Sequence, residues 1–263
     1  MASRLKIDKK EEGPLKLYAI SDLHLALSID KPMDVFGSNW ENYMDKIAAN
    51  WSATVDDDDV VLVPGDLSWA TYMDEAGKDF DFLESLPGTK LLGRGNHDYY
   101  WSTLTKMERF FTERGYKTFK FIRNTATTID CGDGQSYVIS GTRGWRLPGD
   151  KDFLAEDQKI FDREMARLKI CCENIVASDP DHISKRIIML HYPPITRANG
   201  NSEMIRLMIE YGIDLCIYGH LHGPRHRVAL EGNDIYADEG GNTIALKCVA
   251  SDYLGFVPWQ IDA

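Results

Sequence analysis

The sequence of 263 residues, 43% hydrophobic and 27% charged, fits a single globular domain over residues 1–263 with a sizeable core. Its formal net charge of −11 disfavours a general nucleic-acid surface, because affinity for a polyanion comes mainly from lysine and arginine. No apolar run approaches the ~18 residues of a membrane span, the N-terminus lacks a secretory pattern, and five unpatterned cysteines indicate free thiols, so we expect a cytoplasmic protein.

Apolar runs suited to buried strands alternate with helical patterns along the chain. The runs predict strands at 15–21, 59–65, 90–95, 186–192 and 214–220. Apolar residues at helical spacing predict helices at 40–54, 102–114, 153–177 and 202–211. Residues 135–142 and 242–250 are expected to form strands of hairpins or of a second sheet. This alternation favours an α/β or α+β layered fold with mixed sheets.

Each of the five predicted buried strands ends in side chains that can bind a metal ion or transfer a proton. The strands lead into the motifs SDLH, GDL, GNHD, HYPP and GHLH, in that order. Ligands bind outside the carboxyl ends of strands in open α/β sheets, so we expect one shared crevice there. The candidate metal ligands are Asp22, His24, Asp66, Asn96, His191, His220 and His222.

These seven donors are too many for one tetrahedral ion. Side chains two positions apart on an extended segment point the same way, so His220 and His222 can reach into the same crevice. The mixture of carboxylate, amide and imidazole donors fits two divalent ions such as Mn, Fe or Zn, with Asp66 as a bridge. Two ions about 3.5–4 Å apart suit in-line displacement at phosphorus.

Each candidate also has a simpler interpretation when it is taken alone. An isolated histidine is more often a hydrogen-bonded structural residue, an Asp at a strand end is often a helix cap, and Asn-His-Asp can be a turn. The chain would lack a metal site only if all of these simpler interpretations held at once. The sequence therefore favours a metal centre.

The five ordered motifs, which span residues 20–223, resemble those of the calcineurin-like metallophosphoesterase superfamily, in a compact bacterial-type member. The resemblance implies a four-layer αββα sandwich of two mixed β-sheets flanked by helices. It assigns one metal ion to Asp22, His24, Asp66 and His222, and a second to Asp66, Asn96, His191 and His220. It places His97 near the leaving-group oxygen as a catalytic residue that is cationic in the resting state.

The chemistry that the resemblance implies is metal-dependent hydrolysis of a small phosphorylated substrate. A metal-bridging hydroxide would attack the phosphoester in line, and His97 would protonate the departing alkoxide. A small phosphodiester such as a cyclic nucleotide is the leading expectation, with a phosphomonoester or a nucleotide pyrophosphate as the alternative. A nuclease and a non-catalytic interaction module are less favoured.

One motif departs from the phosphoprotein phosphatases of this superfamily. They typically carry Asp-Arg-Gly after the GD motif, whereas this chain reads GDLSWATY, with Trp69 in the place of that Asp. The change disfavours protein phosphatase activity and removes the carboxylate that would orient His97; the neighbouring Asp98 need not face the ring.

For substrate contacts, Arg143 is either a phosphate clamp or a surface cation, and Tyr99 either a stacking residue or a packed one.

Overall fold

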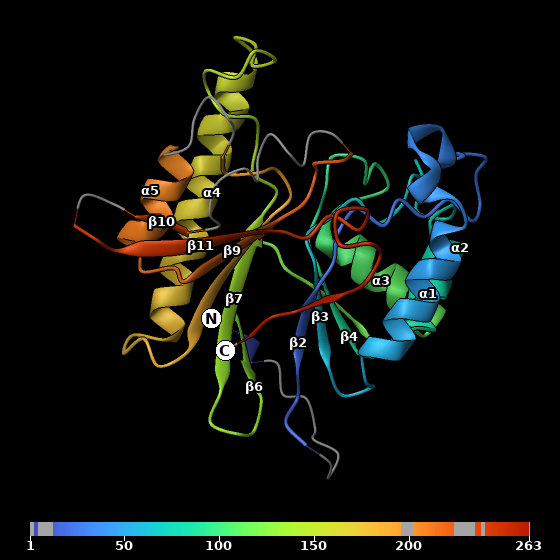
Figure 1. Cartoon of the computed structure of the whole chain (residues 1–263), viewed down its shortest axis with the longest axis horizontal. Helices are drawn as coiled ribbons and strands as arrows, with labels where there is room; N and C mark the ends of the chain where they lie inside the picture. The colour runs from blue at the N-terminus through green and yellow to red at the C-terminus, as the bar shows by residue number, and fades with distance from the viewer. Residues whose placement is uncertain (1–2, 5–12, 196–201, 224–234, 238–239, 263) are drawn as a thin grey trace.

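Figure 1 shows the computed structural model of the chain, which describes residues 3–4, 13–195, 202–223, 235–237 and 240–262. Two mixed β-sheets occupy the centre of the molecule, and helices cover the outer face of each sheet. The α/β sandwich of four layers, αββα, is therefore confirmed.

The five-stranded sheet has the strand order β12-β2-β3-β4-β5. Its edge strand β12 is antiparallel to β2, and the other neighbours are parallel. Helices α1, α2 and α3 lie on its outer face, on the right of Figure 1. The bounds are β2 (Leu17–Ala19), β3 (Val60–Val63), β4 (Thr89–Leu92), β5 (Phe119–Phe121), β12 (Trp259–Gln260), α1 (Tyr43–Thr54), α2 (Gly77–Glu84) and α3 (Leu104–Arg114).

The seven-stranded sheet has the strand order β1-β6-β7-β8-β9-β11-β10. Its central strands β7, β8, β9 and β11 are parallel, whereas the β6–β7 and β10–β11 pairs are antiparallel. Helices α4 and α5 lie on its outer face. The bounds are β1 (Ser3–Arg4), β6 (Thr127–Asp130), β7 (Ser136–Thr142), β8 (Lys185–Leu190), β9 (Leu215–Tyr218), β10 (Ile235–Ala237), β11 (Thr243–Cys248), α4 (Asp157–Ser178) and α5 (Glu203–Glu210).

The core has three apolar layers, because both faces of each central strand are buried. In β3, Val60 and Leu62 pack between the two sheets, whereas Val61 and Val63 pack under α1, α2 and α3. In β8, Ile187 and Met189 belong to the layer between the sheets, and the alternate residues pack under α4 and α5. This burial on both faces explains why the strands are apolar runs rather than alternating sequences.

The helices start later than their apolar spacing predicts. Helix α1 begins at Tyr43 rather than at residue 40, because Ser38–Trp40 forms a short 3-10 helix and Asn42 has a left-handed backbone with φ 53°. Helix α4 begins at Asp157 rather than at 153.

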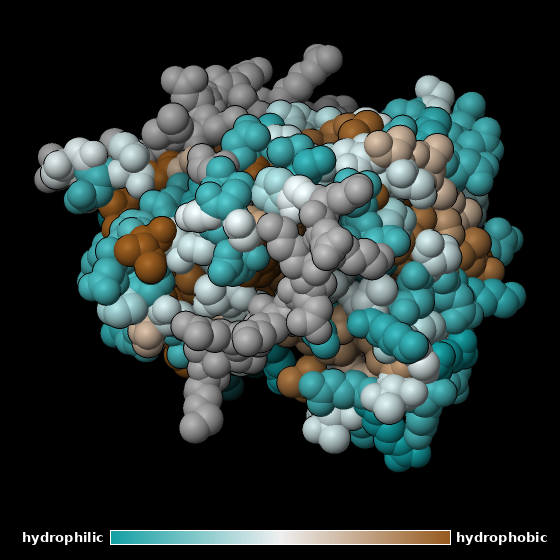
Figure 2. Space-filling view, turned by 90° about the horizontal axis from the view of Figure 1, so that it is seen from below, coloured by the Kyte–Doolittle hydropathy of each residue, from teal (hydrophilic) through white to brown (hydrophobic). Residues whose placement is uncertain are grey.

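The face seen in Figure 2 is mainly hydrophilic, with small separate groups of hydrophobic residues. Within the described part of the chain, no helix is both long and apolar enough to cross a membrane.

Candidate metal centre

The eight metal and catalytic candidates lie on loops that follow the carboxyl ends of five strands. Three loops follow β2, β3 and β4, and two follow β8 and β9, which are parallel neighbours within their own sheets. The Gly219 N–H donates to the carbonyl of His191 at 3.1 Å, and Ser21 forms a parallel bridge with Ala250. The first contact ties the loops after β8 and β9 together, and the second joins the ends of the two sheets, so the five loops form one edge of the sandwich.

The first group of donors contains Asp22, His24, Asp66 and His222. The Nε2 atom of His24 lies 3.1 Å from Nε2 of His222 and 3.9 Å from a carboxylate oxygen of Asp66. The Nε2 atom of His222 also lies 3.3 Å from an oxygen of Asp22. Ligand atoms of Asp22, His24 and His222 lie within 4.8 Å of one another, a spacing that can hold one cation.

The second group contains Asp66, Asn96, His191 and His220. The Nε2 atom of His191 lies 2.7 Å from Oδ1 of Asn96 and 3.5 Å from an oxygen of Asp66. The Nδ1 atom of His220 lies 2.7 Å from the same Asn96 oxygen and 3.3 Å from Nε2 of His191. The two groups meet at Asp66 and at Asp22, because ligand atoms of Asp22, Asp66 and His191 also lie within 4.8 Å of one another. The arrangement gathers all seven donors that the sequence singled out.

Four of the donors have a left-handed backbone, which non-glycine residues adopt only rarely. The φ angles are 57° at Asp22, 48° at His24, 53° at Asp66 and 71° at His220. Such conformations persist only where the surrounding structure enforces them, and they cluster at functional sites. The backbone strain of these loops thus coincides with the donor groups.

Glycines and backbone hydrogen bonds hold the two carboxylates in these loops. A Cβ atom on Gly95 would collide with the carboxylate of Asp66, and a Cβ atom on Gly219 would collide with that of Asp22. The N–H of His97 donates to Asp66 at 2.8 Å, and the N–H of His220 donates to Asp22 at 3.0 Å. The glycines in these motifs therefore allow the close approach that the donor geometry needs.

The two buried carboxylates, Asp22 and Asp66, do not ionise independently. Burial and the negative charges of Asp22 and Asp98 raise the pKa of Asp66 well above its usual value. Burial alone would raise the pKa of Asp22 as well, but hydrogen bonding to His222 and its charge outweigh burial and lower the pKa. Two ionised carboxylates this deeply buried need nearby positive charge, which divalent cations supply.

Three of the imidazoles are held neutral and can present a lone pair. Burial lowers the pKa of His191 to about 4, and it also lowers the pKa values of His24 and His220 well below the usual range. Metal ions bind neutral imidazole, so no proton must be displaced from these rings at neutral pH. The residues present thus fit divalent cations in both groups.

His222 is oriented by Asp252, a residue that carries no sequence motif. Its Nδ1 atom lies 2.9 Å from a carboxylate oxygen of Asp252, and Asp252 also accepts the N–H of Gly223 at 3.0 Å. Burial would lower the pKa of His222, but Asp22 and Asp252 raise it to about 10. A carboxylate–imidazole pair of this kind commonly supports a metal ligand.

His97 borders the donors without belonging to either group. Its ring lies 5.6 Å from that of His24 and 4.2 Å from that of Trp69, and its Nδ1 atom lies 3.3 Å from the hydroxyl of Tyr99. Burial and the charges of His222 and Lys31 lower its pKa, with Asp22 opposing them. The surrounding residues therefore do not favour the protonated form of His97 that the resemblance implies. The negative charge of a bound phosphate would have to favour it instead.

Asp98 holds the loops together and does not orient His97. It is completely buried, and its carboxylate accepts the N–H groups of Gly95 at 2.7 Å, Leu67 at 2.9 Å and Asp66 at 3.0 Å. It also accepts the hydroxyl of Tyr100 at 3.0 Å. One side chain thereby ties the loop after β3 to the loop after β4.

The two candidate substrate residues lie in different surroundings. Tyr99 is exposed, and its hydroxyl faces His97, whereas the following Tyr100 is buried among α2 and α3. The guanidinium carbon of Arg143 lies 4.5 Å from the centre of the Trp145 ring. The backbone carbonyl of Arg143 accepts the N–H of His191 at 3.0 Å. Arg143 also lines a cavity with four other arginines, which the sequence motifs did not reveal.

The sequence matches the family model of calcineurin-like phosphoesterases over residues 15–224. No curated protein matches it. Among solved structures, a phosphopantetheinyl hydrolase from Mycobacterium tuberculosis aligns with a TM-score of 0.54 at 15% identity, over 95% of this chain and 96% of its own. A protein of unknown function from Aquifex aeolicus aligns with a TM-score of 0.48 at 16% identity, over 94% of this chain and 95% of its own. The mycobacterial likeness shows a shared fold.

Proposed function

The chain belongs to the calcineurin-like phosphoesterase family, and from this membership we propose that it hydrolyses a small phosphodiester with the help of two divalent metal ions. The observation that carries the proposal is the convergence of seven donors into two groups, with an oxygen of Asp66 near His24 in one group and near His191 in the other. Asp22, His24, Asp66 and His222 would hold one ion, and Asp66, Asn96, His191 and His220 the other. Several imidazole ligands favour Mn, Fe or Zn over Mg.

When bound, the ions supply positive charge to the phosphoryl oxygens and lower the pKa of a coordinated water. The chain contributes the geometry. Asp66 lies between the two donor groups, and the loops around it are held by Asp98. His97 stands beside the donors with its Nδ1 atom on the Tyr99 hydroxyl, where the other ring nitrogen can carry a proton to a departing alkoxide.

On the family resemblance alone, a small diester such as a cyclic nucleotide is the leading substrate class. A nucleotide pyrophosphate is the second candidate, and the cluster of arginines beside Arg143 favours it. The mycobacterial neighbour, named a phosphopantetheinyl hydrolase, supports hydrolysis of an organic phosphate on this fold.

The test combines metal analysis with a panel of substrates in Mn-containing buffer. The panel contains bis(p-nitrophenyl) phosphate, p-nitrophenyl phosphate, cyclic nucleotides and nucleotide pyrophosphates. We expect up to two transition-metal ions per chain and more activity on diesters than on monoesters. Protein made in metal-supplemented medium that contains essentially no metal would overturn the proposal, and a strong preference for monoesters would reverse the substrate ranking.

The variant Asp66→Asn distinguishes an effect on metal binding from an effect on folding. Asn tolerates the left-handed backbone at position 66, so the loop can keep its conformation while it loses the shared carboxylate. We expect the metal content and the activity to fall together, with an unchanged far-ultraviolet circular dichroism spectrum. Retention of two ions by this variant would show that Asp66 does not link the two sites.

A further inference from the structure

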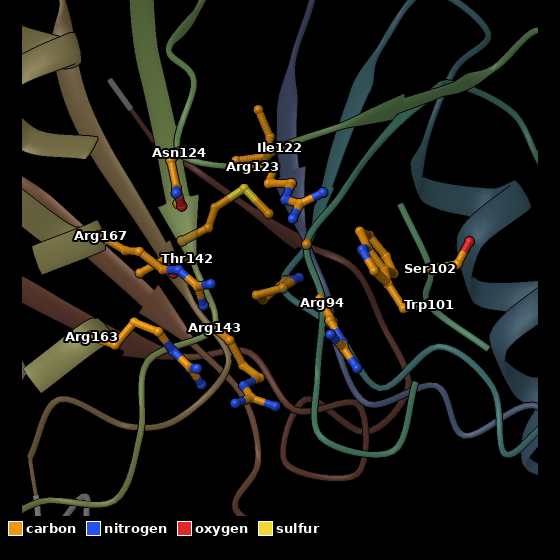
Figure 3. Close-up of a pocket in the computed structure, with 14 residues that line it drawn as sticks. Arg94, Trp101, Ser102, Ile122, Arg123, Asn124, Thr142, Arg143, Arg163 and Arg167 are labelled. Atoms are coloured by element: carbon orange, nitrogen blue, oxygen red, sulfur yellow. The ribbon is translucent and has the colours of Figure 1, made fainter. Parts of the chain in front are cut away.

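Five arginine side chains surround a cavity of about 340 Å³ in a protein whose net charge is −11. Figure 3 shows them around one space, although they come from separate parts of the chain. Arg94 follows β4, Arg123 follows β5, and Arg143 follows β7. Arg163 and Arg167 lie one turn apart on α4. We call these five residues the arginine pocket.

Most of the positive charge in the arginine pocket is not balanced by nearby carboxylates. Arg167 is paired with Glu164, whose other oxygen accepts the hydroxyl of Thr142 at 2.7 Å. Within the described ranges, the structure gives the other four arginines no ion pair with a carboxylate. Like charges gathered in this way repel each other, so a structure that keeps them together is suited to an anion.

The arginine pocket lies beside the metal centre, although none of the residues that line it is a metal donor. Arg94 is two residues from Asn96, so their Cα atoms are at most about 7 Å apart. The carbonyl of Arg143 accepts the N–H of His191 at 3.0 Å. One small molecule can therefore place a phosphoryl group at the metal donors and another anionic group among the arginines.

We propose that the arginine pocket binds a second phosphoryl group of the substrate, one that is not cleaved. The planar guanidinium fork of arginine matches phosphate oxygens, and several forks around one space suit a terminal phosphate or a diphosphate. The inference rests on the proposed function for the group that is cleaved. It narrows the substrate to an organic phosphate with at least two phosphoryl groups, such as a nucleotide pyrophosphate, and ranks this class ahead of a cyclic nucleotide, which has only one.

The first test measures binding without the metal reaction. Chelator-treated protein is titrated with inorganic pyrophosphate and with ADP in a calorimeter. Arg123→Gln and Arg163→Gln should each weaken binding by about tenfold or more, because each removes a charge-assisted contact to phosphate. Both side chains are exposed, so neither change should unfold the protein. Arg109→Gln is the matched control, since Arg109 is an exposed arginine of α3 that pairs with Glu113. Absence of binding, or equal binding by all variants, would overturn the proposal.

The second test uses the metal-loaded enzyme. For Arg163→Gln, the KM for a nucleotide pyrophosphate should rise at least about tenfold more than the KM for bis(p-nitrophenyl) phosphate, which has a single phosphoryl group. Equal changes on both substrates would reject a subsite for a second phosphate. If the protein binds pyrophosphate but hydrolyses none of the substrates, the anion site stands and the proposed function is wrong.

Discussion

The Nδ1 atom of His222 lies 2.9 Å from Asp252, while Nε2 of the same ring lies 3.3 Å from Asp22. The ring is thus held between two carboxylates, one from the loop after β2 and one from beyond β11. Asp252 sets the orientation of the imidazole, so that Nε2 points toward the first group of donors. This makes Asp252 a positioning residue for the proposed metal centre, although it is not a donor itself.

Asp252→Asn should therefore weaken metal binding without removing a ligand. Loss of a carboxylate behind a metal-binding imidazole typically costs about 10–100-fold in affinity. The measurement is a competition between the protein and a metal-binding dye, followed by elemental analysis. Asp56→Asn, in the exposed loop before β3, provides a control with the same change of charge. If both variants keep the wild-type affinity, Asp252 does not support the metal centre.

His97→Asn tests the proton donor. The loss of turnover should be about 10²–10⁴-fold for a substrate with a poor alkoxide leaving group, because the departing oxygen then needs a proton. The loss should be much smaller for p-nitrophenolate, which departs without one. Metal content should hardly change, since the ring of His97 lies outside both donor groups.

Both kinds of substrate and the metal content should be measured on one preparation of His97→Asn. Equal losses on good and poor leaving groups would leave His97 with a charge-stabilising role only. Loss of a metal ion would place His97 among the ligands.

Asp98→Asn should loosen the loops that carry Asp66 and Asn96. An amide in place of the carboxylate can no longer accept hydrogen bonds on both sides, so at least one buried N–H loses its partner at a cost of about 1–3 kcal/mol. Urea unfolding should show this loss together with weaker metal binding. Tyr100→Phe is the milder comparison, because it removes one donor and leaves the three N–H bonds to Asp98 in place. Equal stability of Asp98→Asn and the wild type would contradict the role as a clamp.

The convergence of the proposed donors was predictable because each lies in a short motif directly after an apolar strand. Parallel strands bring their carboxyl ends to one edge, so local patterns at Asp22, Asp66 and His191 already indicated a shared crevice. The packing of two mixed sheets followed from the family resemblance rather than from apolar periodicity, and the strand order within each sheet was not predicted. Short elements such as β5 and α2 escaped the prediction.

The supporting residues were not predictable from local patterns. Asp252 lies thirty positions after His222, and no motif relates the two. The arginine pocket combines residues between 94 and 167 that both sheets and α4 bring together, and only Arg143 was noticed in the sequence. Such sites depend on tertiary packing, which spacing along one strand or helix does not encode.

A buried lysine makes the stability of the fold depend on pH at alkaline values. Lys90 of β4 is completely buried, with its ammonium group donating to the carbonyl of Leu86 and to the hydroxyl of Thr118. Burial lowers the pKa of Lys90 from 10.5 to about 8, while Glu84 and Asp57 oppose the shift. At neutral pH the folded state therefore contains a buried charge that the unfolded state exposes to water.

The resulting pH dependence has a definite sign. Below pH 8, Lys90 is protonated in both states, and the cost of burying its charge is constant. Between pH 8 and about 10.5, the unfolded chain binds the proton and the folded chain does not, so the free energy of unfolding rises with pH, by about 3 kcal/mol in all. Lys90→Met lacks this group, so the wild type should gain stability relative to Lys90→Met as the pH rises from 7.5 to 10. Urea unfolding of both proteins across this range measures the difference and cancels the titration of other groups. A constant difference would show that Lys90 keeps an ordinary pKa in the fold.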